Sequence, residues 1–408
     1  MLSSFVRNVI RSTANQTRLY TAGVLPSLYT FSDEENMMRE AVQRFAKEEL
    51  APKVAEMDEK AQLDMDMFAQ MFDLGLMGME IPEKYGGTEM NFTSSCIVIE
   101  ELAKVDPAVS VICDIQNTLI NTAFMKYANE DLQEKYLPKL ARDYVGSFAL
   151  SEPGSGSDAF AMKTRADKVG NKYVINGGKC WISNAREAGV FLVFANVDPS
   201  KGYKGITAFA VDRNTEGLEI AKKENKLGIR ASSTCTIHFN DMEVPEENIV
   251  GELGKGYKIA IGLLNEGRVG IAAQMLGLAQ GVFDHTVPYL FQREQFGQAI
   301  GKFQGMQFQY AQCAADIEAA RLMVYNAARM KEEGKDIVKQ AAIAKLYASD
   351  VAEKVASKCV ELMGGVGFTK EYPIEKYYRD CKIGKIYEGT SNIQLQTIAK
   401  LLEKEYSS

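Results

Sequence analysis

Histidine is scarce in this sequence. His238 and His285 are the only two among 408 residues, and they stand far apart in the chain. This scarcity disfavours a catalytic triad or a metal centre built on histidines. The seven cysteines are scattered, odd in number and never spaced as C-x-x-C, which predicts reduced thiols in a core rather than disulfides or a zinc site. We therefore expect no metal.

Two glycine-rich signatures are missing as well. Neither G-x-G-x-x-G nor G-x-x-x-x-G-K-[ST] occurs, so the usual dinucleotide-binding and P-loop motifs are excluded. No apolar run approaches the length that crosses a bilayer, and we expect no integral membrane segment. What remains is an ordinary globular composition, with 46% hydrophobic and 25% charged residues, and a length that suits two or three domains.

The first 32 residues differ from the rest because they contain no Asp, Glu or Lys. Arg7, Arg11 and Arg18 recur at helical spacing opposite apolar residues, and Ser and Thr are plentiful. This composition predicts a mitochondrial transit peptide over residues 1–32; the alternative is a disordered tail. Removing the three arginines takes the net charge from −7 to −10, and an acidic protein is a poor partner for nucleic acid.

Helical patterns dominate residues 33–146. Ser32 followed by Glu35 predicts a capping box and a helix from there to about residue 60. Further helical patterns follow around 64–75, 92–104 and 131–142. We therefore expect an N-terminal helical domain.

The pattern changes at about residue 147. A short apolar strand runs into the Gly/Ser/Pro turn of "FALSEPGSGSD" at 148–158, and an alternating segment around Gly170 and Asn171 predicts a hairpin. Buried-strand runs follow at 190–197 and 205–213. Residues 147–251 are therefore predicted to form a β domain.

Long helical patterns return from residue 252. Four of them, the last ending in "TIAKLLEKEY", predict a C-terminal four-helix bundle over residues 252–408. The fold class expected from this order is α+β, with an N-terminal helical domain, a middle β domain and a C-terminal helical bundle.

Five motifs together resemble one protein family. "FALSEPGSGSD", "CWISNA", "REQFG" with "FQGMQ", "ELMGGVGF" and "YEGTSNIQ" are similar to motifs of the acyl-CoA dehydrogenases, in that family's order and spacing. The resemblance covers nearly all of residues 33–405 and is strongest to the short/branched-chain subfamily of mitochondria. It implies FAD as cofactor, acyl-CoA as substrate, an electron-transfer flavoprotein as electron acceptor and a location in the mitochondrial matrix.

The resemblance implies FAD contacts in three of the motifs, "FALSEPGSGSD", "CWISNA" and "YEGTSNIQ". By themselves, the small residues at 151–157 favour an ordinary turn, and a lone tryptophan is usually part of a core. In the family, Ser151 bonds the pyrimidine edge, Trp181 is a flat wall against the flavin ring, and Ser183 donates to the flavin nitrogen that receives hydride. The implied contacts are Phe148, Ala149, Leu150, Ser151, Gly156, Ser157, Trp181, Ile182, Ser183, Thr390, Ser391 and Asn392.

A further group of FAD contacts is implied to come from a neighbouring subunit. An arginine between two helices is by itself a solvated loop residue, but in the family the matching residues hold the pyrophosphate and adenosine of that neighbour's FAD. Many members have Gln at the position of Glu361, which puts that one side-chain contact in doubt. Shared sites imply an obligatory oligomer, a homotetramer built as a dimer of dimers. The residues are Arg293, Phe296, Gln304, Glu361, Leu362, Met363, Gly364 and Gly365.

Glu388 is the implied catalytic base. It precedes a helix that Thr390 or Ser391 can cap, so free N–H groups lie nearby. In the family, a thioester carbonyl bonds the N–H at this position and a flavin hydroxyl, the carboxylate takes the α-proton, and the β-hydrogen leaves as hydride. The helix end lowers the pKa of this carboxylate, and apolar surroundings raise it. The implied substrate contacts are Ser157, Tyr203, Tyr257, Asn265, Glu266, Gly267, Arg268, Tyr387 and Gly389.

The resemblance therefore implies α,β-dehydrogenation of short or 2-methyl-branched acyl-CoA to trans-2-enoyl-CoA, in fatty acid or branched-chain amino acid catabolism. Three alternatives remain at this point. They are an acyl-CoA oxidase, an enoyl-CoA reductase that runs the same site in reverse, and a non-catalytic CoA-binding scaffold.

Overall fold

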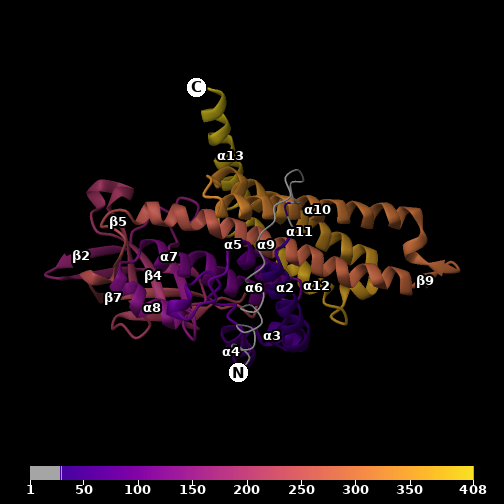
Figure 1. Cartoon of the computed structure of the whole chain (residues 1–408), viewed down its shortest axis with the longest axis horizontal. Helices are drawn as coiled ribbons and strands as arrows, with labels where there is room; N and C mark the ends of the chain where they lie inside the picture. Colours follow the sequence, from indigo (N-terminus) through magenta and orange to yellow (C-terminus); the bar gives the residue numbers. More distant parts are fainter. Residues whose placement is uncertain (1–27, 29, 408) are drawn as a thin grey trace.

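The computed structural model describes residue 28 and residues 30–407 of the chain. The predicted transit peptide lies almost wholly outside these described residues. Figure 1 shows a sheet-rich part at one end of the long axis, a set of long helices reaching the other end, and shorter helices along one side. The α+β fold class predicted from the sequence is confirmed.

The shorter helices form the N-terminal part. The capping box at Ser32 is confirmed, since the Ser32 hydroxyl accepts from Glu35 N and the Glu35 carboxylate accepts from Ser32 N at 2.8 Å. The helix that follows is interrupted by a π-helical turn at 46–50 and a 3₁₀ turn containing Pro52. The helices are α2 (Asp33–Phe45), α3 (Val54–Lys60), α4 (Met65–Asp73), α5 (Phe92–Ala103), α6 (Pro107–Asp114), α7 (Thr122–Tyr127) and α8 (Glu130–Leu140).

The middle part is one twisted sheet with its own apolar core. Its strand order is β6-β7-β3-β2-β4-β5-β8, and β1 pairs in parallel with β4. The hairpin predicted at Gly170 and Asn171 joins β2 to β3 in antiparallel register. The strands are β1 (Val145–Ala149), β2 (Arg165–Val169), β3 (Lys172–Ser183), β4 (Ala188–Asn196), β5 (Ile206–Asp212), β6 (Leu218–Lys223), β7 (Thr234–Pro245) and β8 (Ile249–Val250).

The C-terminal part contains the long helices. Helices α9, α10 and α11 pack along one another, and a small ribbon of β9 and β10 closes the turn between α9 and α10 at the end of the molecule farthest from the large sheet (Figure 1). The elements are α9 (Gly256–Gln292), β9 (Glu294–Gln295), β10 (Gln298–Ala299), α10 (Gln304–Glu332), α11 (Val338–Met363), α12 (Ile374–Asp380) and α13 (Ser391–Tyr406).

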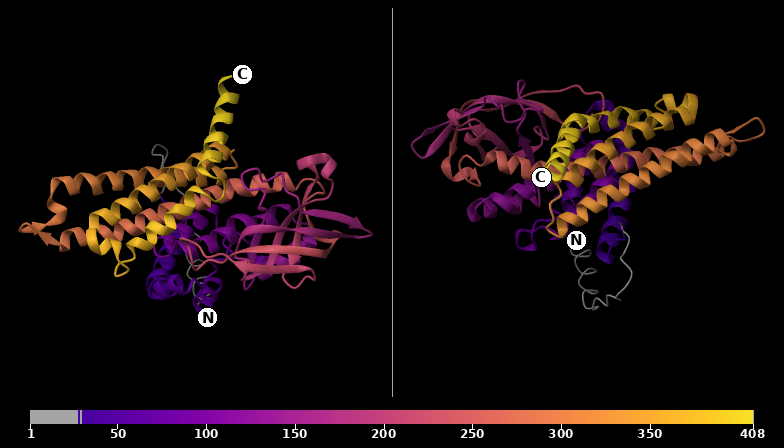
Figure 2. Two further views of the ribbon diagram at one scale, coloured as in Figure 1. Left: turned by 180° about the vertical axis from the view of Figure 1, so that it is seen from behind. Right: turned by 90° about the horizontal axis from the view of Figure 1, so that it is seen from above.

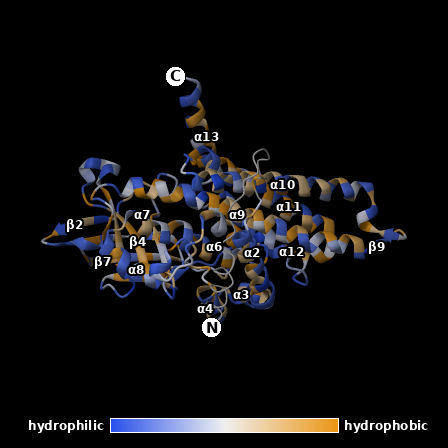
Figure 3. Cartoon of the chain, viewed as in Figure 1, coloured by the Kyte–Doolittle hydropathy of each residue, from blue (hydrophilic) through white to orange (hydrophobic). Residues whose placement is uncertain are grey.

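Helix α13 starts against α11 and then projects away from the other helices, as the left view in Figure 2 shows. It carries hydrophobic and hydrophilic residues along its length (Figure 3), and Leu395 and Leu402 on it are exposed. The fourth long helix of the predicted bundle is therefore only partly packed within a single chain.

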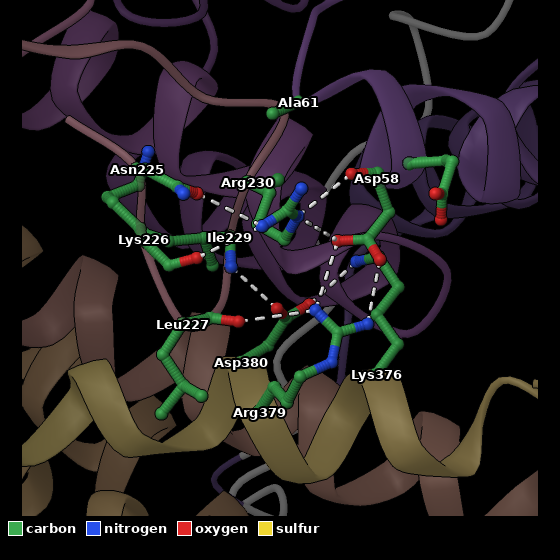
Figure 4. Close-up of polar contacts among 12 residues, drawn as sticks. Asp58, Ala61, Asn225, Lys226, Leu227, Ile229, Arg230, Lys376, Arg379 and Asp380 are labelled. Carbon is green, nitrogen blue, oxygen red and sulfur yellow. Dashed lines mark hydrogen bonds and ion pairs between the residues drawn. The ribbon is translucent and has the colours of Figure 1, made fainter. Parts of the chain in front are cut away.

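A cluster of charged side chains joins the three parts of the chain (Figure 4). The Arg379 guanidinium on α12 donates to both oxygens of Asp58 on α3, at 2.7 Å and 3.2 Å. Arg230, in the loop between β6 and β7, donates to the carbonyl of Asp58 at 3.0 Å, and Ile229 N donates to Asp380 at 2.5 Å. These contacts fix the C-terminal end of α12, from which the chain continues to Glu388.

The seven cysteines are all buried and unpaired, and all lie in the described part of the chain. The prediction that these side chains lie in a core is confirmed. Among the described residues, no group of three His, Cys, Asp or Glu side chains could hold a metal ion. In the same residues, no helix combines the length and the apolar character that a membrane span requires.

Candidate active site

Glu388 lies in a left-handed turn just before α13. Its φ is +52°, and that of Gly389 is +87°. The Thr390 hydroxyl then caps α13 by accepting from Ile393 N at 3.4 Å. A positive φ is unusual for a glutamate and costs backbone energy, so surrounding contacts must hold the turn.

Two buried side chains hold this turn through its carbonyl groups. The ammonium of Lys345 on α11 donates to the Gly389 carbonyl at 2.7 Å. The amide of Gln394 on α13 donates to the same carbonyl at 2.8 Å and to the Glu388 carbonyl at 3.1 Å. Both side chains are fully buried. The carbonyl oxygens of Glu388 and Gly389 therefore accept hydrogen bonds within the protein, and these bonds fix the position of the Glu388 N–H.

The carboxylate of Glu388 is set up to ionise near neutral pH. Its Oε2 atom is buried and has no hydrogen-bond partner among the described residues. Burial raises the pKa of Glu388 to about 7, although the positive charges of Lys345 and Arg268 act in the opposite direction. A carboxylate that is free to accept a proton, and that titrates near the working pH, suits a general base.

Gly267 on α9 faces this carboxylate directly. A β-carbon built on Gly267 would lie 3.0 Å from Glu388 Oε2 and 3.0 Å from Leu119. Because Gly267 has no side chain, there is room beside α9 for the Glu388 carboxylate.

The neighbouring Glu266 points elsewhere. Its carboxylate forms ion pairs with Lys331 at 2.8 Å and with Lys126, so it faces α7 and α10 rather than Glu388. The structure does not bring this side chain to the Glu388 turn, although the resemblance placed Glu266 among the substrate contacts.

Arg268 lies on the same stretch of α9 with spare hydrogen-bonding capacity. It donates to Asn265 at 2.9 Å, and its Nε atom is buried without a partner in the described part of the chain. Tyr203 and Tyr257, two other expected substrate contacts, meet edge to face with ring centroids 4.9 Å apart. Tyr387 donates through its hydroxyl to Gln274 on α9, which fixes the residue before the base.

The expected FAD contacts at 148–151 and 181–183 come together where β1 and β3 end. Cys180 N donates to the Ser151 carbonyl at 2.9 Å, and the Ser147 hydroxyl donates to the Ser183 carbonyl at 2.6 Å. The loop after β1 is thereby joined to the end of β3 that carries Trp181. Phe148, Ala149, Leu150 and Ile182 are mostly covered by this packing, whereas Gly156 and Ser157 are exposed.

Trp181 is not part of the core. Its side chain is 64% exposed, and its φ of +60° turns it out of the strand. A large aromatic ring held outside the core by a strained backbone is typical of a ligand-binding surface. Gly154 and Gly156 in the adjacent loop have nothing of the described protein within 4 Å of a built β-carbon. The end of β3 and the loop after β1 therefore offer an exposed aromatic ring and accessible backbone, both of which suit contact with a flavin.

The turn of Glu388 and the start of α13 carry the remaining residues of the first group of expected FAD contacts. The Ser391 hydroxyl is buried and without a hydrogen-bond partner among the described residues, and Asn392 beside it is exposed. Thr390 is half-buried. An unsatisfied buried hydroxyl is expected to have a partner, and a bound cofactor would supply one.

The second group of expected FAD contacts lies far from the first. Arg293, Phe296 and Gln304 are exposed around the β9–β10 ribbon, and Phe296 is 95% exposed. Figure 1 shows this ribbon at the opposite end of the chain from the large sheet. One chain does not bring the two groups together.

The segment 361–365 presents a similar open surface at the end of α11. Glu361, Gly364 and Gly365 are exposed, while Leu362 and Met363 are buried. Gly364 has a φ of +63°, and a β-carbon at Gly364 or Gly365 would meet nothing described within 4 Å. The Glu361 carboxylate pairs with Lys358 at 2.5 Å and is exposed.

Sequence reasoning missed three buried polar residues around the base. Lys345 and Gln394 hold the turn, and Asp114 on α6 is a fully buried carboxyl whose pKa is raised well above its usual value by burial and then by the charge of Glu388. The available signal was a polar residue on an otherwise apolar helix face, as in "AAIAKLYA" and "SVICDIQ".

Comparison with known proteins gives a consistent result along the chain. Sequence models of the acyl-CoA dehydrogenase N-terminal, middle and C-terminal domains match residues 32–143, 147–242 and 254–402. The chain is 59% identical over 379 residues, or 93% of its length and 88% of the relative's, to "Short/branched chain specific acyl-CoA dehydrogenase, mitochondrial" of Rattus norvegicus.

Solved structures agree with the sequence relatives. Butyryl-CoA dehydrogenase from Megasphaera elsdenii superposes with a TM-score of 0.90 at 40% identity, over 92% of this chain and 99% of that one. A glutaryl-CoA dehydrogenase from Mycobacterium smegmatis, in complex with FADH2, superposes with a TM-score of 0.87 at 29% identity over 92% of this chain and 95% of that one.

Proposed function

Because the chain belongs to the acyl-CoA dehydrogenase family and is an FAD-dependent oxidoreductase, we propose that it dehydrogenates short or 2-methyl-branched acyl-CoA to the trans-2-enoyl-CoA, with Glu388 as the base. The observation that carries the proposal is the Glu388 carboxylate, whose Oε2 atom is buried and has no partner within the described residues, and whose pKa is raised to about 7 by burial. The branched substrate class rests on the rat relative, whose name specifies it.

The residues of this chain divide the work as follows. Trp181, Ser151 and Ser183 where β1 and β3 end, with Thr390, Ser391 and Asn392 after the turn, would hold FAD, which when bound would supply the acceptor for the hydride from the β-carbon. Glu388 takes the α-proton on its carboxylate, and the backbone N–H of Glu388 donates to the thioester carbonyl, which makes the α-proton more acidic.

Burial serves this step in two ways. It shields the Oε2 atom of the carboxylate from water, and it raises the pKa of Glu388 toward the pH at which the enzyme works. The opposing charges of Lys345 and Arg268 keep the carboxyl ionisable despite its burial. Arg268 and Asn265 on α9, with Tyr203, Tyr257, Tyr387 and Gly389, would line the path of the acyl-CoA.

A homotetramer is part of the proposal. The exposed Arg293, Phe296 and Gln304 lie around the β9–β10 ribbon, at the opposite end of the molecule from the large sheet (Figure 1), so an FAD site that uses both groups of contacts would need a second copy of the chain. Light scattering on the purified holoenzyme is expected to give a mass about four times that of the chain. A monomer that binds FAD tightly would contradict this proposal.

We propose a mitochondrial location, because the name of the rat relative specifies mitochondria. We propose that residues 1–32 direct the chain to the matrix, where the remaining domains, 33–146, 147–251 and 252–408, fold, and that an electron-transfer flavoprotein takes the electrons. Reoxidation of the reduced enzyme by such a flavoprotein, with little peroxide formed in air, would support the last point. Rapid peroxide formation would instead indicate an oxidase.

A substrate panel tests the proposed reaction. Purified protein should be yellow and should bleach without oxygen when substrate is added. The kcat/KM values for butyryl-, isobutyryl-, 2-methylbutyryl-, isovaleryl- and hexanoyl-CoA are expected to place a 2-methyl-branched substrate first. A clear preference for hexanoyl-CoA would overturn the substrate class, and a colourless protein that takes up no FAD would overturn the function.

A further inference from the structure

Lys345 is a fully buried lysine on a helix face that is otherwise made of small apolar residues. It occupies the same face of α11 as Ala341, Ala348 and Ala352, all of them buried against the neighbouring helices. An ammonium in such a place is costly unless it is paired and hydrogen-bonded. Its position therefore calls for a specific partner.

The partner is the Glu388 turn. Lys345 Nζ donates to the Gly389 carbonyl at 2.7 Å, although the two residues are 44 positions apart in the sequence. The same carbonyl also accepts from Gln394 at 2.8 Å. Two donors from two helices thus fix one peptide group in a turn where Glu388 and Gly389 both have positive φ.

The charges that face Glu388 come from several elements. Arg268 on α9 and Lys345 on α11 are positive, and Tyr387 precedes Glu388 in the same turn. Asp114 on α6 is a buried carboxyl whose pKa is raised well above its usual value by burial and then by the charge of Glu388. Burial lowers the pKa of Lys345 to about 8, and the charges of Glu388 and Asp350 act to raise it. Lys345 is therefore still positively charged in the range where Glu388 ionises.

We propose that Lys345 is a positioning residue for the proton acceptor: it fixes the left-handed turn through the Gly389 carbonyl, and its charge stabilises the ionised carboxylate of Glu388. The proposal rests on the proposed role of Glu388 as base. Lys345 exchanges no proton with the substrate. The geometric and the electrostatic effect can be separated, because Gln394 also donates hydrogen bonds to the turn but carries no charge.

Variants of the FAD-loaded enzyme separate the two effects. Lys345→Met removes both the donor and the charge, and we expect kcat to fall by about 10- to 100-fold, as displacement of a reacting group does. The acidic limb of the kcat/KM profile should also move up by about one pH unit, because loss of a nearby positive charge disfavours the carboxylate. Lys345→Gln keeps an amide donor, so it should show the pH shift with a smaller loss of kcat.

Gln394→Leu gives the opposite signature. It removes two hydrogen bonds to the turn but no charge, so kcat should fall while the midpoint of the acidic limb stays in place. Lys354→Met, an exposed lysine on the same helix that pairs with Asp316 on α10, is the matched control and should change neither quantity.

The outcomes are distinguishable from failure of the proposed function. If Glu388→Gln turns over normally, the role of Glu388 is wrong whatever Lys345 does. If Glu388→Gln is inactive but Lys345→Met and Lys345→Gln keep the wild-type midpoint and kcat, the inference about Lys345 alone is overturned. FAD content and melting temperature of each variant identify misfolding, and should Lys345→Met fail to fold, the pH profile of Lys345→Gln decides the question.

Discussion

Glu388 Oε2 stands 3.0 Å from the place where a β-carbon of Gly267 would be. The two residues come from a turn and a helix that are far apart in the chain, and the carboxylate of one fills the space that the other leaves open. A glutamate at position 267 would therefore bring its carboxylate from α9 close to the place that the Glu388 carboxylate now occupies. Glu266, one residue earlier, is directed away because a single step along a helix rotates a side chain by about 100°.

Replacing Glu388 by Gln keeps the shape of the side chain and removes the proton acceptor. We expect Glu388→Gln to bind FAD and acyl-CoA normally and to lose about two to four orders of magnitude in kcat, the usual cost of removing a general base. Glu266→Gln is the matched control, and it should cost far less because that carboxylate is engaged with Lys126 and Lys331. The rate of anaerobic bleaching would be measured for both variants. Near-normal bleaching by Glu388→Gln would contradict the assignment, and Glu266 would then be the next candidate for the base.

Moving the base to the helix tests the facing geometry. The double variant Gly267→Glu with Glu388→Gly should recover part of the activity that Glu388→Gly alone loses, because the new side chain starts 3.0 Å from the original carboxylate. Gly267→Gln with Glu388→Gly is the control with the same size and no proton acceptor. Equal activity in the two double variants would show that position 267 cannot supply a base.

The pH dependence of turnover follows from the pKa of Glu388. Burial raises this pKa to about 7, so below that pH the carboxyl holds its proton and cannot accept one. The value of kcat/KM should therefore rise with pH and level off above about 7, falling roughly tenfold per unit on the acidic side. Measurements from about pH 5.5 to about pH 8.5 on enzyme that retains FAD would check this, and a midpoint near the ordinary value for Glu would contradict it.

The motifs and the helical and strand patterns were enough to predict the order of the three parts and the turn of the base. Patterns along the chain cannot show which buried polar residues meet across helices. Lys345 and Gln394 are forty-nine positions apart in sequence, yet both donate to the Gly389 carbonyl. The pattern around Trp181 alone favoured a core position, and only the family resemblance placed its ring against a flavin; its positive φ and its exposure became visible in the structure.

Trp181 is the only tryptophan of the chain, so its fluorescence reports one site. If its exposed ring lies against the flavin, emission should be quenched in the holoenzyme and should recover when FAD is stripped, with the maximum expected from an exposed ring. The apoenzyme of Phe209→Ala, a change in the separate core of the sheet, would serve as a control for unfolding effects. Equal emission with and without FAD would place the flavin away from Trp181.

The last prediction concerns the ion pair beneath the loop that carries Ser151. Lys179 is fully buried, and its ammonium donates to Glu152 at 2.8 Å and to the Leu150 carbonyl at 3.0 Å. Glu152 in turn accepts from the backbone N–H of Lys163 and Thr164, at 2.6 Å and 3.0 Å. One pair thus ties the loop after β1 to β3 and to the segment before β2.

Breaking this pair should be costly because it leaves a buried carboxylate without its counter-charge. We expect Lys179→Met to lower the free energy of unfolding by about 3 kcal/mol or more and to weaken FAD binding, since the loop loses its anchor. Lys179→Met with Glu152→Gln should regain part of the stability, because the uncompensated charge is gone. Lys168→Ala breaks an exposed pair with Glu246 in the same sheet and should leave the melting temperature unchanged within error. Thermal melts of the apo and holo forms check all three, and a Lys179→Met protein as stable as the Lys168→Ala protein would show that the buried pair does not hold the loop.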